Sequence, residues 1–141
     1  MKNIFGQYTL EQVSKIGNNT MFEHLGMEIT SIDNNKISGK LPVDHRTVQP
    51  MHILHGGASC ALAETLASVG AYLTVNPETH YCVGMEINAN HLRPVKEGHV
   101  YGVASPVHMG RTSQVWSIEI RNEDHKLVCI SRMTIAVVAR Q

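Results

Sequence analysis

One long helical pattern constrains the fold of this chain more than any other stretch. From Gly57 to about Val75 there is no proline, and apolar residues recur at the three- and four-residue spacing of an α-helix. Most of the other positions carry small side chains: Ser59, Cys60, Ala61, Ala63, Ala67, Ser68, Gly70 and Ala71. A helix that is apolar or small on nearly all sides is typically buried, and small side chains let a sheet approach it closely. We therefore expect one buried helix, ended by Asn76-Pro77, at the centre of the fold.

Alternating apolar residues predict β-strands before and after this helix. A hairpin is expected over residues 27–43, with Asp33-Asn34-Asn35 as its turn and a loop over residues 44–50. Four more strands are expected, over residues 83–90, 100–105, 115–120 and 127–138. The pattern favours the α+β class, with an antiparallel sheet packed on one helix.

Two short helices are expected at the amino-terminal end of the chain. Thr9 and Thr20 are each followed three residues later by Gln or Glu, which is the spacing of a capping box. Neither segment carries a side chain that suggests chemistry, so we assign them no functional role.

Length and charge exclude several classes of protein. The 141 residues are about the length of one domain, so a single domain is expected over residues 1–141. Twelve basic and twelve acidic residues give a formal charge of zero, which argues against nucleic acid or an anionic membrane as the main partner. No apolar run approaches the ~20 residues that cross a bilayer, and no signal-peptide core precedes Gly17. A cytoplasmic location is therefore expected.

Glu64 is a lone carboxylate inside the long helix, and it has two interpretations. If the helix is buried there, desolvation of the carboxylate is costly unless it has a partner or a catalytic task. A base or nucleophile tuned by partial burial contributes ~10²–10⁴ in rate. Alternatively, Glu64 and Ser68 lie on one solvent-facing stripe, because residues four apart share a helix face. The pattern alone leaves both interpretations open.

The segment His55-Gly56-Gly57 precedes the helix and suggests a site for developing negative charge. The free N–H groups and the dipole at a helix start favour an oxyanion, and one such donor contributes roughly 3–4 kcal/mol to transition-state stabilisation. The alternative is a tight turn without a function. Glu64 lies ~10–12 Å from these N–H groups at 1.5 Å per residue, too far for both to act on one carbonyl. A second subunit would have to supply the carboxylate.

Other candidate motifs are weaker. His52 and His55 have a metal-pair spacing but no third ligand nearby, so no metal site is expected. Cys60, Cys82 and Cys129 are widely spaced and predict neither a disulfide framework nor a zinc site. Cationic or hydrogen-bonding side chains near strand ends could meet phosphates or form a solvated rim: His91, Arg93, Lys96, His108 and Arg111.

In combination, several of these motifs closely resemble the hotdog-fold acyl-CoA thioesterases, over nearly the whole chain from about Leu10. The residues that carry the resemblance are Gln49, His55-Gly56-Gly57, Glu64, Ser68, residues 83–91 and Gln114-Val115-Trp116. Within the family, the chain is most similar to the branch that hydrolyses aromatic acyl-CoAs, including 1,4-dihydroxy-2-naphthoyl-CoA in menaquinone or phylloquinone biosynthesis. It is also similar to a relative that proofreads aryl-carrier-protein thioesters.

This resemblance implies a hotdog fold, in which a long antiparallel sheet wraps one central helix. It also implies a homodimer paired edge to edge, a homotetramer of two such dimers, and an active site at the dimer interface. Coenzyme A is expected only as part of the substrate, without a metal or redox cofactor. The implied reaction is hydrolysis of an aromatic acyl-CoA to the free acid and CoA. A proofreading thioesterase, a 2-enoyl-CoA hydratase or dehydratase, and a non-catalytic acyl-CoA binding module are the alternatives.

The resemblance also implies roles for individual residues. The Gly56 N–H would polarise the thioester carbonyl, with His55 and Gln49 ordering its loop. Glu64 of the partner subunit would act as nucleophile or general base, and Ser68 would help to hold water. Segments that match CoA contacts are Gly84, His91, Leu92, Arg93, Pro94, His108, Met109, Gly110, Arg111, Thr112 and Ser113. The family often has Phe-Gly where this chain has Met51-His52-Ile53, so the acyl-pocket wall is expected to differ.

Overall fold

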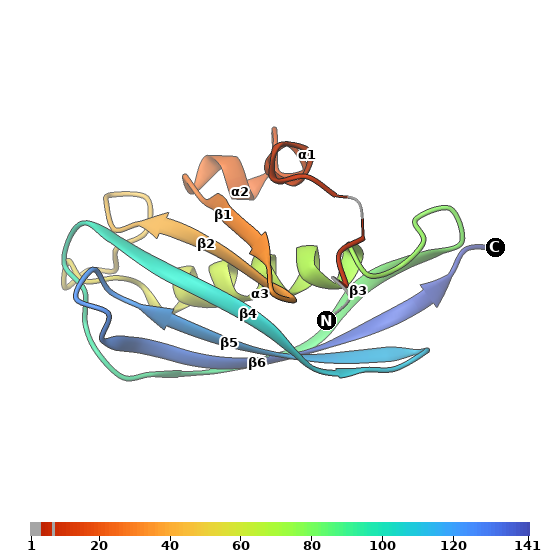
Figure 1. Ribbon diagram of the computed structural model, residues 1–141. Coiled ribbons are helices and arrows are strands. Elements are labelled where there is room, and N and C mark those ends of the chain that lie inside the picture. Colours follow the sequence, from red (N-terminus) through yellow and green to blue (C-terminus); the bar gives the residue numbers. More distant parts are fainter. Residues whose placement is uncertain (1–3, 7) are drawn as a thin grey trace.

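Six strands and one long helix form most of the molecule (Figure 1), as the computed structural model shows for residues 4–6 and 8–141. The strands are β1 (Glu28–Asp33), β2 (Lys36–Pro42), β3 (His80–His91), β4 (His99–Met109), β5 (Ser113–Arg121) and β6 (Leu127–Ala139). The helices are α1 (Leu10–Ser14), α2 (Met21–His24) and α3 (Gly56–Tyr72). The single domain over 1–141 stays a prediction, and its residues 1–3 and 7 lie outside the described part.

The strands form one antiparallel sheet in the order β1-β2-β4-β5-β6-β3. The sheet curls around α3, which confirms the predicted α+β architecture of an antiparallel sheet wrapped around one helix (Figure 1). β3 is an edge strand that pairs only with β6, although it follows α3 directly in the chain. No strand of the described residues pairs with the other edge of β3.

Every predicted strand is present, and most are longer than their alternating patterns. The largest difference is in β4, which was expected over residues 100–105 and continues to Met109. Pro106 interrupts the alternation, and the pairing of β4 with β5 shifts register between Pro106 and His108. Such a bulge keeps two strands paired across a residue that cannot donate a backbone hydrogen bond. The sequence pattern therefore stops before the strand does.

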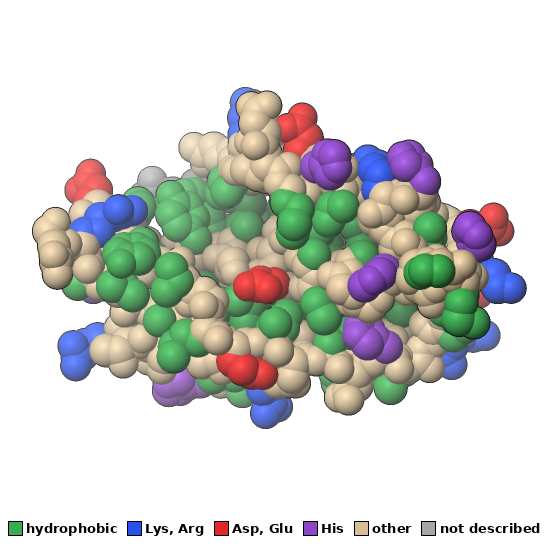
Figure 2. Space-filling model, turned by 180° about the vertical axis from the view of Figure 1, so that it is seen from behind, with side chains coloured by type: hydrophobic (Ala, Val, Ile, Leu, Met, Phe, Trp, Pro, Cys, Tyr) green, Lys and Arg blue, Asp and Glu red, His purple; other side chains and the backbone are tan. Residues whose placement is uncertain are grey.

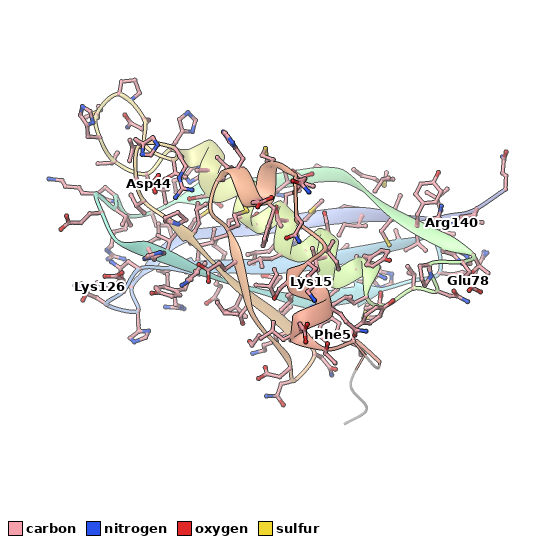
Figure 3. All side chains as sticks on the ribbon, turned by 90° about the horizontal axis from the view of Figure 1, so that it is seen from above. Phe5, Lys15, Asp44, Glu78, Lys126 and Arg140 are labelled. Atoms are coloured by element: carbon pink, nitrogen blue, oxygen red, sulfur yellow. The ribbon has the colours of Figure 1, made fainter. Side chains whose placement is uncertain are left out.

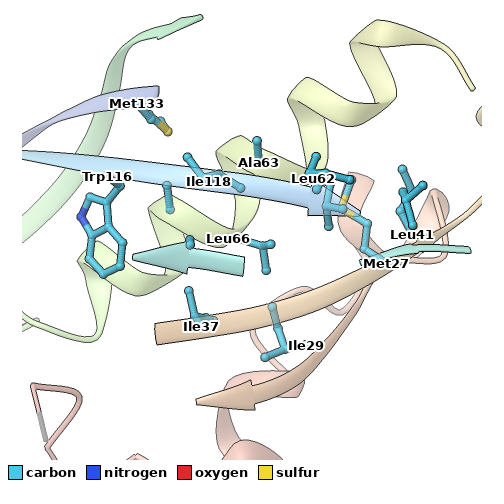
Figure 4. Packing of buried hydrophobic residues seen from close by; sticks show 14 of the residues in the cluster. Met27, Ile29, Ile37, Leu41, Leu62, Ala63, Leu66, Trp116, Ile118 and Met133 are labelled. Carbon is cyan, nitrogen blue, oxygen red and sulfur yellow. The ribbon is translucent and has the colours of Figure 1, made fainter. Parts of the chain in front are cut away.

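The core lies between α3 and the inner face of the sheet. Figure 4 shows Leu62 and Leu66 of α3 among buried side chains from the sheet. Gly39 of β2 pairs with Gly102 of β4, and a Cβ at either position would lie 2.7–2.8 Å from a methyl group of Leu66. The helix can approach the sheet here only because both strands lack a side chain. The expected close approach thus comes from glycines in the strands as well as small residues in the helix.

A buried hydrogen-bond chain ties the carboxyl end of α3 to β5. The Trp116 indole Nε1–H donates to Gln114 Oε1 at 2.9 Å, and Gln114 Nε2 donates to Thr74 Oγ1 at 2.8 Å. The indole packs against Gly70, where a Cβ would lie 2.8 Å from its Cη2. Buried polar groups are stable only when paired in this way.

The two short helices lie over α3, on the side that the sheet leaves open (Figures 1 and 3). Thr9 and Gln12 form the predicted capping box of α1. The second capping box is wrong: Thr20 accepts from the Phe22 N–H, but the Glu23 carboxylate accepts from the N–H of Asn19 instead of Thr20. α2 is accordingly a single turn.

Candidate active site

The amino end of α3 is shaped by His55 and the two glycines after it. The His55 ring caps the helix, because its Nδ1 accepts from the Gly57 N–H at 2.8 Å. A Cβ at Gly57 would lie 2.9 Å from that nitrogen, so a glycine leaves room for the ring. α3 begins at Gly56, one residue earlier than predicted, because this cap stabilises the first turn.

Gly56 has a backbone N–H without an acceptor among the described residues, and it borders a pocket. Within the described residues its N–H has no hydrogen-bond acceptor, as expected for the first residue of a helix. A Cβ at Gly56 would lie 2.8 Å from His91 Nε2, so the imidazole of β3 packs directly against this turn. The adjoining pocket has a volume of about 450 Å³ and is lined by Gln49, Ile53, Leu54, Gly56, Ser59, His91, Leu92, Arg93, Pro94 and Val128.

Gln49 holds the loop that leads to this turn. Its side-chain Oε1 accepts from the Met51 N–H, and its own N–H donates to the Ile53 carbonyl at 2.9 Å. The His55 N–H donates to the Thr47 carbonyl at 2.8 Å, which fixes the other end of the loop. The structure thus places Gln49 and His55 where they can order the segment before Gly56.

Glu64 lies two turns further along α3 and faces the centre of β3. A Cβ at Gly84 would lie 3.0 Å from Glu64 Oε1, so the carboxylate rests against bare backbone of the edge strand. Of the two sequence interpretations, the protomer shows the solvent-facing one: Glu64 is exposed and Ser68 half-buried. The carboxylate is exposed because β3 has no neighbour on this side. Burial and the Glu64 charge both raise the pKa of the Cys60 thiol, which disfavours thiolate chemistry here.

A second, mostly apolar pocket lies beside Glu64. It has a volume of about 290 Å³ and is lined by Val13, Ile16, Gly17, Thr20, Met21, Phe22, Ile29, Glu64, Thr65, Ser68 and Val69. Figure 2, which views the molecule from behind, shows acidic side chains amid hydrophobic ones, with histidines toward one end.

The sequence reasoning missed this pocket because it assigned no role to α1 and α2. A signal was present: helices of four or five residues are too short to be stable alone, so their apolar residues must pack on something.

The two candidate catalytic groups, the Gly56 N–H and the Glu64 carboxylate, lie apart in the protomer; each is called a half-site. Gly56 lies at the His91 end of β3, whereas Glu64 lies at Gly84, seven residues away along the strand. This placement agrees with the separation expected from the helix rise.

The segments matched to CoA contacts divide in the same way. Residues 91–94 adjoin Gly56, while residues 108–113 form the β4–β5 turn at the opposite end of the sheet. Strand β6 shows that these are opposite ends of the sheet. His91 pairs with Cys129 near the start of β6, whereas Ser113 pairs with Ala136 near its end, close to the pair of His80 with Ala139. One protomer therefore does not bring all the predicted site residues together.

The described residues contain neither a cluster of metal ligands nor a helix suited to crossing a membrane. None of their His, Cys, Asp and Glu side chains forms a group of three or more that could hold a metal ion, so His52 and His55 gain no third ligand there. In the same part of the chain, no helix is long and apolar enough to cross a membrane.

Comparison with known proteins defines the class of this fold and site. The thioesterase superfamily matches residues 51–129. The 1,4-dihydroxy-2-naphthoyl-CoA hydrolase of Escherichia coli (strain K12) is 45% identical over 130 residues, which are 92% of this chain and 95% of that protein. The proofreading thioesterase EntH of Cronobacter turicensis is 46% identical over 130 residues, 92% of this chain and 94% of EntH.

A solved structure shows the same architecture. The crystal structure of a thioesterase from Haemophilus influenzae superposes with a TM-score of 0.90 at 46% identity, covering 94% of this chain and 92% of that one. The sheet wrapped around α3 is thus the hotdog fold of thioester hydrolases. The chain belongs to the thioesterase superfamily, and its substrate is an acyl thioester.

Proposed function

We propose that this thioesterase hydrolyses an aromatic acyl-CoA to the free acid and CoA at a site shared between two protomers. In each site, the Glu64 carboxylate of one protomer and the Gly56 N–H of its partner act on one thioester. The observation that carries this proposal is the position of the two groups: each adjoins the edge strand β3, but at a different point along it. The E. coli relative named for an aromatic acyl-CoA supports the substrate class.

Pairing of two β3 edges joins the half-sites. In an antiparallel pair related by a two-fold axis near Ile87 and Asn88, midway along this stretch, Gly84 lies opposite the partner's His91. Glu64 then faces the partner's Gly56. Near the edge that would pair, β3 exposes the apolar side chains Tyr81, Val83 and Met85, of which Met85 is 67% exposed.

With these residues, hydrolysis of the thioester can follow two mechanisms. In one, the Glu64 carboxylate removes a proton from water, which attacks the acyl carbon; in the other, Glu64 attacks first and water cleaves the resulting anhydride. In both, the C–S bond breaks, CoA leaves as the thiol after protonation, and the Gly56 N–H donates to the developing oxyanion. Ser68 shares the pocket of Glu64 and can hold the attacking water. Neither route requires a metal or redox cofactor.

The two-fold arrangement also assigns places to the two parts of the substrate. The acyl group occupies the apolar pocket beside Glu64, and the pantetheine arm leaves through the pocket beside the partner's Gly56. Because β3 strands pair antiparallel, residues 108–113 of one protomer come to the same end as residues 91–94 of its partner. We assign CoA contacts to both segments. Pairing of dimers into a tetramer, a cytoplasmic location and a role in menaquinone biosynthesis remain parts of this proposal.

A mixed-dimer experiment tests the shared site. Glu64→Ala and Gly56→Val are prepared separately with different tags, unfolded and refolded together, and assayed by release of free thiol from a panel of aryl and fatty acyl-CoAs. Each variant alone is expected to be inactive. The mixture should recover about a quarter of wild-type activity, since half of the dimers are mixed and each has one intact site. Isolated mixed dimers without activity would contradict the shared site, and an active Glu64→Ala homodimer would contradict the role of Glu64.

A carrier-protein thioester is a second candidate substrate, because EntH is named as a proofreading thioesterase. The same residues would act on the same bond, so the carrier alone differs. Comparing kcat/KM for one aryl group presented on CoA and on an aryl carrier protein separates the two substrates.

A further inference from the structure

We propose that Phe22, seated against Gly17, is the end wall of the acyl pocket and restricts the enzyme to compact, ring-sized acyl groups. This inference rests on the proposed function, because it takes the pocket beside Glu64 as the acyl site. It assigns a specificity-determining role to the short amino-terminal helices, to which the sequence pattern assigns none.

Phe22 separates two cavities. On one side is the apolar pocket of about 290 Å³ that contains Glu64. On the other side is a pocket of about 390 Å³, lined by Ser14, Asn18, Phe22, Glu23, Gly26, Met27, Glu28 and Ile29. Among the described residues, Phe22 and Ile29 alone line both cavities. Ile29 is a buried core residue of β1, whereas Phe22 is half-buried on the one-turn helix α2. The aromatic ring is thus the removable part of the partition.

The ring is held in place by the turn before it. A Cβ at Gly17 would lie 2.2 Å from Phe22 Cδ1 and 2.5 Å from Cγ, so the ring lies directly on the backbone of Gly17. The Thr20 hydroxyl joins the two residues: it donates to the Gly17 carbonyl at 2.6 Å and accepts from the Phe22 N–H at 3.3 Å. Behind the ring, the Met27 N–H donates to the Phe22 carbonyl at 3.0 Å. These contacts hold the Phe22 ring in place, although α2 is only four residues long.

This position determines which acyl groups fit. The reacting carbonyl must lie at Glu64, so the acyl group extends from the carboxylate into a pocket that Phe22 closes. One or two fused rings fill such a compact apolar space, whereas a long alkyl chain meets the ring. Without the ring the two cavities join and more than double the space for the acyl group. Each further methylene that is then buried is expected to raise kcat/KM by about fourfold.

The test compares acyl-length selectivity in wild type and Phe22→Ala. We measure kcat/KM for benzoyl-, naphthoyl- and straight-chain acyl-CoAs from six to sixteen carbons. Wild type should prefer the aryl substrates and lose activity on long chains. Phe22→Ala should raise the ratio of dodecanoyl-CoA to benzoyl-CoA activity by tenfold or more, and Phe22→Trp should lower it. A ratio unchanged in both variants would overturn the inference.

Leu25→Ala is the matched control. Leu25 caps the same helix and is half-buried, but it lines neither cavity, so its truncation should reduce thermal stability without changing the ratio. Phe22→Trp keeps an aromatic wall and tests the inference even where Phe22→Ala is unstable. Glu64→Ala, assayed on every substrate, tests the proposed function separately. If Glu64→Ala is inactive and the Phe22 variants do not change the ratio of dodecanoyl-CoA to benzoyl-CoA activity, only the role of Phe22 as the pocket wall is refuted. If Glu64→Ala is active, the proposed active site itself is refuted.

Discussion

Gly84→Ala moves the Glu64 carboxylate without replacing it. Gly84 does not have a positive φ, so alanine is compatible with its backbone. The added Cβ would lie 3.0 Å from Glu64 Oε1, whereas ordinary contacts of a Cβ begin at 3.4 Å. The carboxylate must therefore shift by about 0.4 Å. Because a 1 Å misplacement at a reacting centre costs about 10²-fold in rate, we expect kcat to fall roughly five- to tenfold.

The measurement is free-thiol release under saturating naphthoyl-CoA, with KM determined in parallel. Gly84 lines neither the acyl pocket nor the pocket at Gly56, so a change in KM would report on its predicted CoA contact, whereas the fall in kcat reports on the carboxylate. The dimer content of the variant is checked by mass, since β3 carries the proposed interface. Wild-type kcat in a folded, dimeric Gly84→Ala would refute the proposed position of the carboxylate.

A second neighbour of the new methyl group provides the control. The same Cβ would lie 2.5 Å from Met133 Cε, at the far end of a flexible buried side chain. Met133→Leu removes that methyl group and leaves Glu64 in contact. The double variant should keep the loss in kcat, and full recovery of activity would show that core crowding, not the carboxylate, caused the loss.

Three further predictions concern stability. Gln114→Leu leaves the buried Trp116 Nε1–H without its acceptor and should lower the free energy of unfolding in urea by about 1–3 kcal/mol. Leu66→Ala opens a cavity under α3 and should cost about 2–5 kcal/mol, measured by thermal unfolding. Hydrogen bonds from Arg46 lower the pKa of Asp44 to about 2, so this pair stabilises the fold above pH ~4 and the contribution fades as the pH falls toward 2. Asp44→Asn should therefore destabilise by under ~1 kcal/mol at pH 7 and by less at pH 2, where the carboxylate is partly protonated; an equal effect at both would contradict the ion pair.

Local sequence rules predicted most of the fold because they act over a few residues. The capping box at Thr9 and the hairpin turn at Asp33-Asn34-Asn35 depend on neighbours in the chain, and both are present. The predicted end of the long helix at Asn76-Pro77 is wrong: α3 ends at Tyr72, and the Thr74 N–H already donates to Ala71 in a tighter turn. The continuation of β4 past Pro106 was missed because a bulge depends on the partner strand. Strand order was also beyond the pattern, which does not show that β3 pairs with β6.

One part of the candidate site could be predicted from the sequence and the other could not, again because local patterns do not show which distant segments meet. The turn at Gly56 could be identified because its glycines and the histidine before it are consecutive. The pocket beside Glu64 could not, since its walls come from α1, α2, β1 and α3, which meet only in the fold. Phe22 lies within the capping segment that starts at Thr20, but that pattern does not show where its ring packs. Its position depends on a contact with Gly17 that spacing alone does not reveal.

The free edge of β3 connects the features that remain unexplained in one protomer. An edge strand with exposed apolar side chains and unpaired backbone groups tends to associate with another chain. Here Val83 and Met85 are exposed on that edge, on either side of the glycine that contacts Glu64. A partner strand that pairs with this edge also encloses the carboxylate, so the burial expected for a residue of α3 would be supplied by the second chain. In the proposed dimer the exposed Glu64 and the unpaired Gly56 N–H have one cause, because each protomer would supply the missing half of its partner's site.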